Sequence, residues 1–197
     1  NVGTRQSPKL AAAKRIQVDW PSTPTKPAWT WWKPQGRQLV TQWRTTPCAT
    51  DFNKDGLIDL VMLDHEGYLS LYERRRVGKQ LKLLPPRRIF VDDKGKATRL
   101  NPGRAGRSGR RKLAIVDWDG DGRLDFLANS VNADLLRNTA NQDGKTVLKN
   151  LGSLSRHKLA GHTSSPTVVD WNRDGIPDLL VGAEDGHFYY MRNPRTK

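Results

Sequence analysis

The sequence predicts an all-β protein built from repeated antiparallel meanders, and three observations lead to this prediction. A nine-residue acidic pattern with glycine at its sixth position occurs three times, at residues 51–59, 117–125 and 170–178. Short runs of apolar and β-branched residues, which favour strands, flank every copy. A glycine-containing turn follows the second strand of the first and third copies, at residues 64–67 and 183–186. Repetition of this kind predicts one folding unit that is used three times.

The elements of each unit follow from aligning the acidic patterns, which begin 66 and 53 residues apart. A first strand precedes each pattern, and second and third strands follow it. The predicted strands of the first unit end at Thr50 and cover 60–63 and 68–74. Those of the second unit cover 113–116, 126–129 and 131–137, with a fourth strand expected within 145–159. Those of the third end at Val169 and cover 179–182 and 187–192, and residues 88–91 are also strand-like.

A single four-stranded meander cannot bury both of its faces, so the units are expected to pack side by side. That arrangement is a β-propeller, in which each sheet is one blade. The competing interpretation of the acidic loops is the EF-hand, which requires flanking helices and a glutamate at loop position 12. Position 12 is occupied by Met62, Ala128 and Val181, and the flanks are strands. The pattern therefore excludes EF-hands.

The acidic loops have the chemistry of a site for a hard cation. In residues 117–125 the carboxylates occupy positions 1, 3, 5 and 9, and Gly122 allows the sharp turn between them. Carboxylates about 4 Å apart repel each other by roughly 4 kcal/mol per pair at an effective dielectric constant of about 20. A bound dication removes this repulsion, so the loops predict calcium with a structural role.

The remainder of the chain is strongly basic. The formal net charge is +14, from 34 basic and 20 acidic residues, and ten of the acidic residues lie in the three loops. Such a surface attracts a polyanion: an acidic polysaccharide, a nucleic acid or an anionic membrane. No apolar run reaches the roughly 18 residues of a membrane span. Loops of this kind in extracellular modules rely on millimolar calcium, which favours a secreted, periplasmic or cell-surface location.

The three loops and their strands resemble the FG-GAP/VCBS repeats of integrin-type and bacterial polysaccharide-lyase-type β-propellers. The resemblance rests on three D-x-[DN]-x-D-G-x-x-D loops between strands, and it covers about residues 40–193. It implies calcium in the first hairpin of each blade, about three ions in all. The implied ligands are side chains, except for the backbone carbonyl at position 7: Asp51, Asn53, Asp55, Leu57 and Asp59; Asp117, Asp119, Asp121, Arg123 and Asp125; and Asp170, Asn172, Asp174, Ile176 and Asp178.

The resemblance also predicts how the chain is divided. Residues 1–38 are an N-terminal extension and linker, or outer strands of a preceding blade, and residues 39–197 form three blades (about 39–102, 103–160 and 161–197). Propellers close with about four blades at minimum. The chain is therefore expected to be part of a larger propeller, which missing blades or another chain would complete.

The meander places the calcium loops on one face, so any chemistry is expected on the opposite face. The first hypothesis is a polysaccharide lyase, which needs a group to neutralise the uronate carboxylate, a base and an acid. Arg44 is the candidate neutraliser, His65 or His162 the candidate base, and Tyr68 the candidate acid. A simpler role as a turn or strand-entry residue competes with catalysis at each histidine.

Two other hypotheses remain open. The second is a non-catalytic adhesion module that binds protein or an acidic glycan. In it, the tryptophan cluster at Trp29, Trp31 and Trp32 either stacks on sugar rings or covers a blade edge. The third is nucleic-acid binding through the Gly/Arg-rich segment 101–112, although no nucleic-acid-binding fold accompanies that segment.

Overall fold

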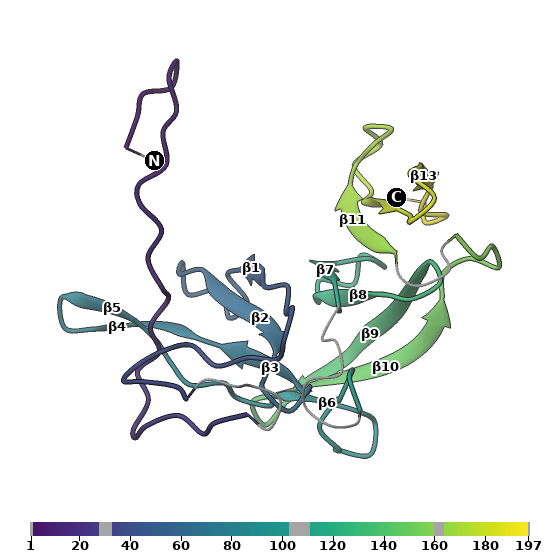
Figure 1. Cartoon of the computed structure of the whole chain (residues 1–197). Helices are drawn as coiled ribbons and strands as arrows, with labels where there is room; N and C mark the ends of the chain where they lie inside the picture. Colours follow the sequence, from purple (N-terminus) through teal and green to yellow (C-terminus); the bar gives the residue numbers. More distant parts are fainter. Residues whose placement is uncertain (1, 28–32, 103–110, 160–163, 197) are drawn as a thin grey trace.

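The computed structural model describes residues 2–27, 33–102, 111–159 and 164–196, and this part of the chain contains strands but no helix. It therefore holds no helix that is long and apolar enough to span a membrane. Three sheets and one separate hairpin make up the fold (Figure 1). The first sheet contains β1 (Cys48–Thr50), β2 (Asp59–Leu63) and β3 (Leu69–Tyr72). The second contains β7 (Leu113–Val116), β8 (Asp125–Asn129), β9 (Ala133–Gln142), β10 (Lys145–Ser153) and β6 (Phe90–Val91). The third contains β11 (Ser165–Val169), β12 (Asp178–Gly182) and β13 (Phe188–Met191), and the hairpin pairs β4 (Arg74–Val77) with β5 (Gln80–Leu83).

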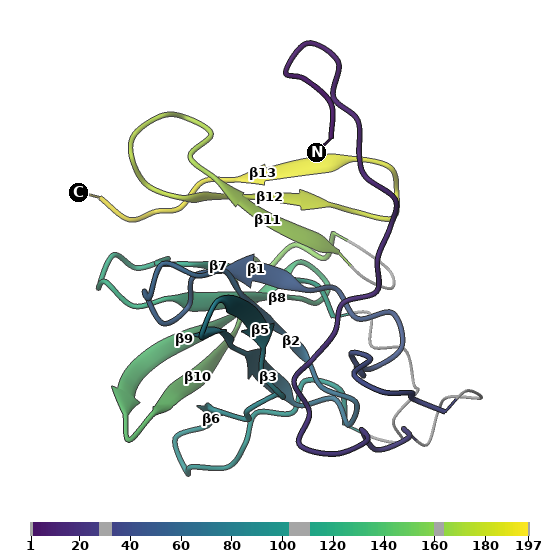
Figure 2. The ribbon, with the colours of Figure 1, turned by 90° about the vertical axis from the view of Figure 1, so that its left-hand side faces the viewer.

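The three sheets are successive blades. In each, antiparallel strands follow one another in chain order, as β1-β2-β3, β7-β8-β9-β10 and β11-β12-β13. β7 lies against both β1 and β11, so the first strand of each sheet is the innermost one. The sheets lie side by side, and their acidic loops project from a common edge (left in Figure 2). The predicted all-β fold of propeller-type blades is confirmed.

The middle strand of each blade explains why the sheets pack together. All five residues of β2 and all five of β8 are buried. Their apolar residues, 60–63 and 126–128, therefore follow one another directly instead of alternating with polar residues. One apolar cluster lies between the first and second sheets and a second between the second and third. Each blade therefore buries apolar side chains on its neighbour, and this burial holds the blades together.

The number of strands per sheet differs from the predicted four. The first sheet ends at β3, and its fourth position is occupied only by isolated bridges at Arg87 and Arg99. Pro85 and Pro86 precede that position, and proline has no backbone N–H with which to continue a ladder. The third sheet also has three strands, whereas the second has five.

The fifth strand of the second sheet is the strand-like segment predicted at 88–91. It forms β6, which pairs in parallel with β10, because Phe90 buries its side chain in the cluster between the first two blades; Val91 is also buried. The strand predicted at 68–74 is also interrupted. The backbone N–H of Arg74 donates to the carboxylate of Asp59 over 2.7 Å, which ends β3 and starts the separate β4–β5 hairpin.

The N-terminal extension runs along the first blade. It forms a bridge between Gln17 and Gln38, and it places Val18, which is 1% exposed, on the outer face of the first sheet. The Trp20 indole N–H donates to the Gln38 carbonyl over 2.9 Å, which holds the two arms of this extension together.

Candidate metal centre

The three acidic loops connect the first and second strands of their blades. Each loop turns at the glycine in its sixth position, and Gly56, Gly122 and Gly175 have φ angles of 84°, 85° and 80°. Residues with a Cβ avoid this left-handed region, so glycine is needed here. The turn directs backbone N–H groups toward the interior of the loop, where the carboxylates lie.

The aspartate at position 1 organises each loop from its first residue. One carboxylate oxygen accepts the N–H of the sixth-position glycine, at 2.9 Å for Asp51, 3.0 Å for Asp117 and 2.9 Å for Asp170. The other oxygen accepts a second backbone N–H, from position 5 in the first and third loops and from position 4 in the second. The loop is therefore curled around its first carboxylate.

The aspartate at position 9 is the buried end of each loop. Asp59, Asp125 and Asp178 are all 0% exposed. One oxygen of each accepts a backbone N–H, from Arg74 just beyond β3, from Asn138 within β9 and from Asn193 just beyond β13, over 2.7, 2.8 and 2.9 Å respectively. Burial raises the pKa of Asp59 and of Asp125, although these N–H donors act in the opposite direction. A buried carboxylate of this kind is stabilised in its charged form by a cation.

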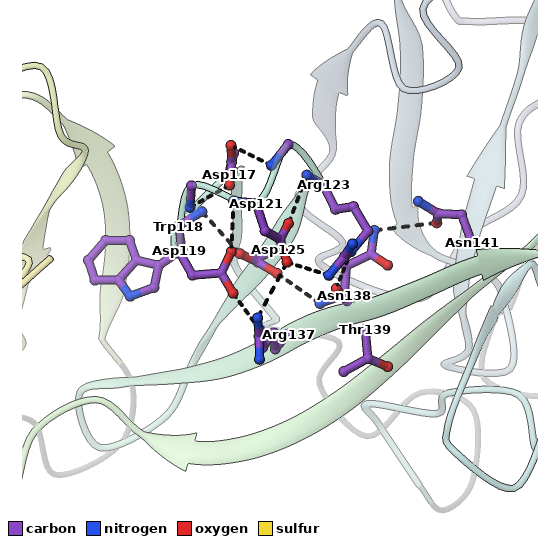
Figure 3. Close-up of polar contacts among 12 residues, drawn as sticks. Asp117, Trp118, Asp119, Asp121, Arg123, Asp125, Arg137, Asn138, Thr139 and Asn141 are labelled. Atoms are coloured by element: carbon purple, nitrogen blue, oxygen red, sulfur yellow. Dashed lines mark hydrogen bonds and ion pairs between the residues drawn. The ribbon is translucent and has the colours of Figure 1, made fainter. Parts of the chain in front are cut away.

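The carboxylates of the second loop lie close to one another (Figure 3). Oxygens of Asp117, Asp119 and Asp125 lie within 4.8 Å of one another. A single ion could contact all three, and oxygen-only donors of this type are those that calcium prefers. The donor set therefore fits the ion that the sequence predicts, with the ligands drawn from both ends of one loop.

The first and third loops have the same curl with one carboxylate fewer. Asparagine occupies position 3, and its side-chain amide donates to the position-5 carboxylate, over 3.1 Å from Asn53 to Asp55 and 2.9 Å from Asn172 to Asp174. In all three loops, the position-5 carboxylate also accepts the N–H of position 7 over 2.9–3.0 Å. These bonds keep the implied side-chain ligands of each loop on one curl.

Arginine side chains neutralise two of the loops, a feature that the sequence analysis missed. Arg137 pairs with Asp119 and Asp121 in the second blade, and Arg192 approaches Asp174 within 3.4 Å in the third. Both arginines lie one residue before the backbone N–H that reaches the position-9 aspartate. The predicted third strands of these two blades both end at this arginine, so comparing the ends of those strands would have revealed the shared position.

Three of the four candidate catalytic residues lie around the first blade. The Arg44 guanidinium lies over the exposed Trp43 ring, 4.4 Å from its centroid, and the guanidinium groups of Arg88 and Arg99 lie over the Tyr68 ring, 3.9 and 5.0 Å from its centroid. His65 is half-buried in the turn between β2 and β3.

No hydrogen bond or ion pair joins Arg44, His65 and Tyr68 in the described part of the chain. The turn at 64–67 is instead an ion-pair network: Arg88 contacts Asp64 at 2.6 Å and also pairs with Glu66, and this guanidinium lowers the pKa of Glu66. His162 and the Trp29, Trp31 and Trp32 cluster lie outside the described residues.

These observations define a class: a propeller-type repeat protein whose blades carry acidic loops suited to calcium. The family model for the FG-GAP-like repeat matches residues 51–128 and, again, residues 117–181. The chain therefore belongs to the FG-GAP-like repeat family. Repeats of this family often bind calcium and are typically extracellular. No curated protein shows a significant match to the sequence.

Proposed function

We propose that this chain is a calcium-stabilised, extracellular binding module that recognises an acidic polysaccharide. FG-GAP-like repeats form propeller-type binding modules, which supports the general class. The observation that carries the proposal is the β4–β5 hairpin, a basic arm that belongs to none of the three sheets. Figure 1 shows this hairpin extending away from the blades.

The hairpin holds five cationic residues within ten positions: Arg74, Arg75, Arg76, Lys79 and Lys82. Arg75 and Lys82 are directly opposite each other in the ladder, which is unfavourable for like charges. Each of these two contacts a carboxylate that it shares with another arginine: Arg75 contacts Glu73 at 2.7 Å, and Lys82 contacts Asp19 at 3.0 Å. These ion pairs anchor the hairpin.

The other three cations have no such partner. No carboxylate pairs with Arg74, Arg76 or Lys79 among the described residues. Arg74 and Arg76 are two residues apart in the extended strand β4. Their side chains therefore lie on the same side of the strand, about 7 Å apart. A row of unneutralised charges on one side is a suitable contact for an anion that repeats along a chain.

The chemistry of the hairpin favours a polysaccharide over a single-stranded nucleic acid. Proteins that bind single strands combine a basic groove with aromatic side chains that stack on bases. Residues 74–83 contain no aromatic residue. The Gly/Arg-rich segment, which suggested nucleic-acid binding, lies outside the described residues from 103 to 110.

Calcium supports this function indirectly. We assign it a structural role, with up to one ion in each of the three loops, because the loops share one edge and brace the strand connections. The first loop is coupled to the hairpin, since Asp59 accepts the N–H of Arg74, the first residue of β4. Calcium in this loop would fix the origin of the basic arm.

The test is a titration of the full chain with polygalacturonate, neutral dextran and duplex DNA at several salt concentrations. We expect binding to the polyuronate that weakens with salt, and none to dextran. Removing these three charges with Arg74→Gln, Arg76→Gln and Lys79→Gln should weaken binding about tenfold, at roughly 0.5 kcal/mol per surface contact. A variant with Arg5→Gln, Lys14→Gln and Arg15→Gln loses the same net charge and is the matched control.

The outcomes separate the alternatives. An equal loss in both triple variants would show that only net charge matters and would reject the hairpin as the site. Binding to duplex DNA without binding to polyuronate would identify a nucleic-acid module. Ultraviolet absorbance from an unsaturated uronate product would show that the chain is a lyase.

A further inference from the structure

Neighbouring blades pack through equivalent residues, which the strand registers identify. The second and third strands of a blade place paired side chains on the face that meets the next blade. In the first blade this face packs against Phe126, Ala128, Leu136 and Leu148 of the second sheet. The face consists of Val61, Leu63, Leu69 and Leu71, none more than 1% exposed.

The second blade repeats the arrangement. Its face contains Leu127 and Leu135, which pair across β8 and β9 as Val61 and Leu71 pair across β2 and β3. These residues contact Leu179 of the third sheet. Leu127 is 0% and Leu135 is 8% exposed, so this interface is also closed.

An aromatic residue at the second position of each acidic loop completes these interfaces. Phe52 contacts the ring of Phe90 with centroids 5.3 Å apart, and Trp118 is 7% exposed between the second and third blades. The corresponding residue of the third loop is Trp171, which is 61% exposed, with its ring centroid 6.4 Å from that of Tyr190 in its own blade.

The face of the third blade is open throughout. By the same registers, Leu180 pairs with Tyr190 and Gly182 with Phe188. Phe188 is 82% and Tyr190 43% exposed, at positions whose equivalents in the first blade are 0% and 1% exposed. Val169 and Trp171 extend this apolar surface at the loop side, so the third blade presents one half of the blade interface.

The other end of the blade array is closed. The outer face of the first sheet presents Leu60, Met62 and Tyr72, and Val18 of the N-terminal extension and Leu83 of β5 cover it. Among the described residues, the outer face of the first blade of a second copy is therefore not free to dock there. Two copies would also bring together two chains of net charge +14, which repel each other.

We infer that the open face of the third blade, formed by Val169, Trp171, Leu180, Phe188 and Tyr190, docks a further blade of the same repeat type. This blade would present the face that the second and third blades present to their predecessors, with two aliphatic residues of its middle strand, as Leu179 and Val181 do. Continuity with two interfaces inside the chain specifies the occupant, which lies outside these 197 residues.

The test supplies such a blade to the intact chain. A second copy of residues 164–196, carrying Trp171→Phe so that its peptides are distinct, is joined to the carboxyl end through a flexible linker. Hydroxyl-radical oxidation of the original Trp171 is then measured by mass spectrometry. Its oxidation should fall about ninefold relative to the unextended chain, the ratio of the exposed fractions of Trp171 (61%) and Trp118 (7%).

Two further chains make the outcome decisive. Phe188→Asp in the original copy changes an 82%-exposed residue and should abolish the protection without affecting the fold. A second extension uses residues 112–159, a four-stranded blade, in case the short copy does not fold. Unchanged oxidation of Trp171 in both extended chains would overturn the proposal, as would protection that survives Phe188→Asp. Concentration-dependent protection in the unextended chain, with a dimer in sedimentation, would show that the occupant is a second copy and would also overturn it.

Discussion

Replacing Phe126 by alanine should separate the first two blades more strongly than any comparable change elsewhere. Phe126 is 0% exposed in β8, and its ring centroid lies 5.1 Å from Phe90 and 6.2 Å from Phe52. Truncation of a buried phenylalanine costs about 3–5 kcal/mol, and each aromatic pair contributes about 0.5–1.5 kcal/mol beyond burial. We therefore expect about 4–5 kcal/mol, a lowering of the melting temperature by about 10–15 °C.

The chain provides its own control for this prediction. Phe188→Ala is the same substitution at a residue that is 82% exposed, and it should change the free energy of unfolding by less than about 0.5 kcal/mol. The assay is urea denaturation of both variants in calcium, followed by circular dichroism. Similar losses in the two variants, or a loss below about 1 kcal/mol for Phe126→Ala, would refute the inter-blade core.

Three further predictions concern the acidic loops. Chelation should lower the melting temperature, because an ion at a hundred times its dissociation constant stabilises by about 2.7 kcal/mol per site; an unchanged curve would reject calcium. In chelator, stability should fall as pH rises above about 4. Burial raises the folded-state pKa of Asp59 and Asp125, so the folded chain binds more protons there than the unfolded chain does. A urea midpoint that falls with pH as steeply in Asp125→Asn as in the unchanged chain would contradict this explanation. Arg137→Gln should destabilise the chain more in chelator than in calcium, since Arg137 pairs with Asp119; equal thermal shifts would show that the pair does not substitute for the ion.

The repeating elements could be predicted from the sequence because their chemistry is local. Carboxylate spacing and a glycine at a fixed position define each loop, and the apolar runs beside it define the strands. The β6 strand shows the limit of this reasoning. The segment 88–91 is visibly strand-like, but nothing local indicates that Phe90 will join the sheet of the next blade, because that choice depends on which core has room for its ring.

The β4–β5 hairpin escaped prediction for a related reason. A run from Tyr68 to Arg74 looks like one strand, since nothing in its pattern shows that the Arg74 N–H will donate to Asp59. The like-charged pair of Arg75 and Lys82 is recognisable only when the register is known. Long-range partners, which the sequence does not display, decide where this strand ends.

One repeat position links the acidic loops to the basic arm. The residue before the N–H that reaches the position-9 aspartate is Arg137 in the second blade and Arg192 in the third, and both approach their own acidic loops. In the first blade the residue is Glu73, which pairs with Arg75 and Arg87.

The presence of glutamate at this repeat position, where the other two blades have arginine, has two consequences. The glutamate directs basic side chains to the base of the hairpin, and it leaves the first loop without an arginine partner among the described residues. We therefore expect the first loop to depend more on calcium than the other two. Because the position-9 aspartate of that loop holds the start of β4, loss of calcium should loosen the basic arm first, so polyanion binding should weaken before the blades unfold.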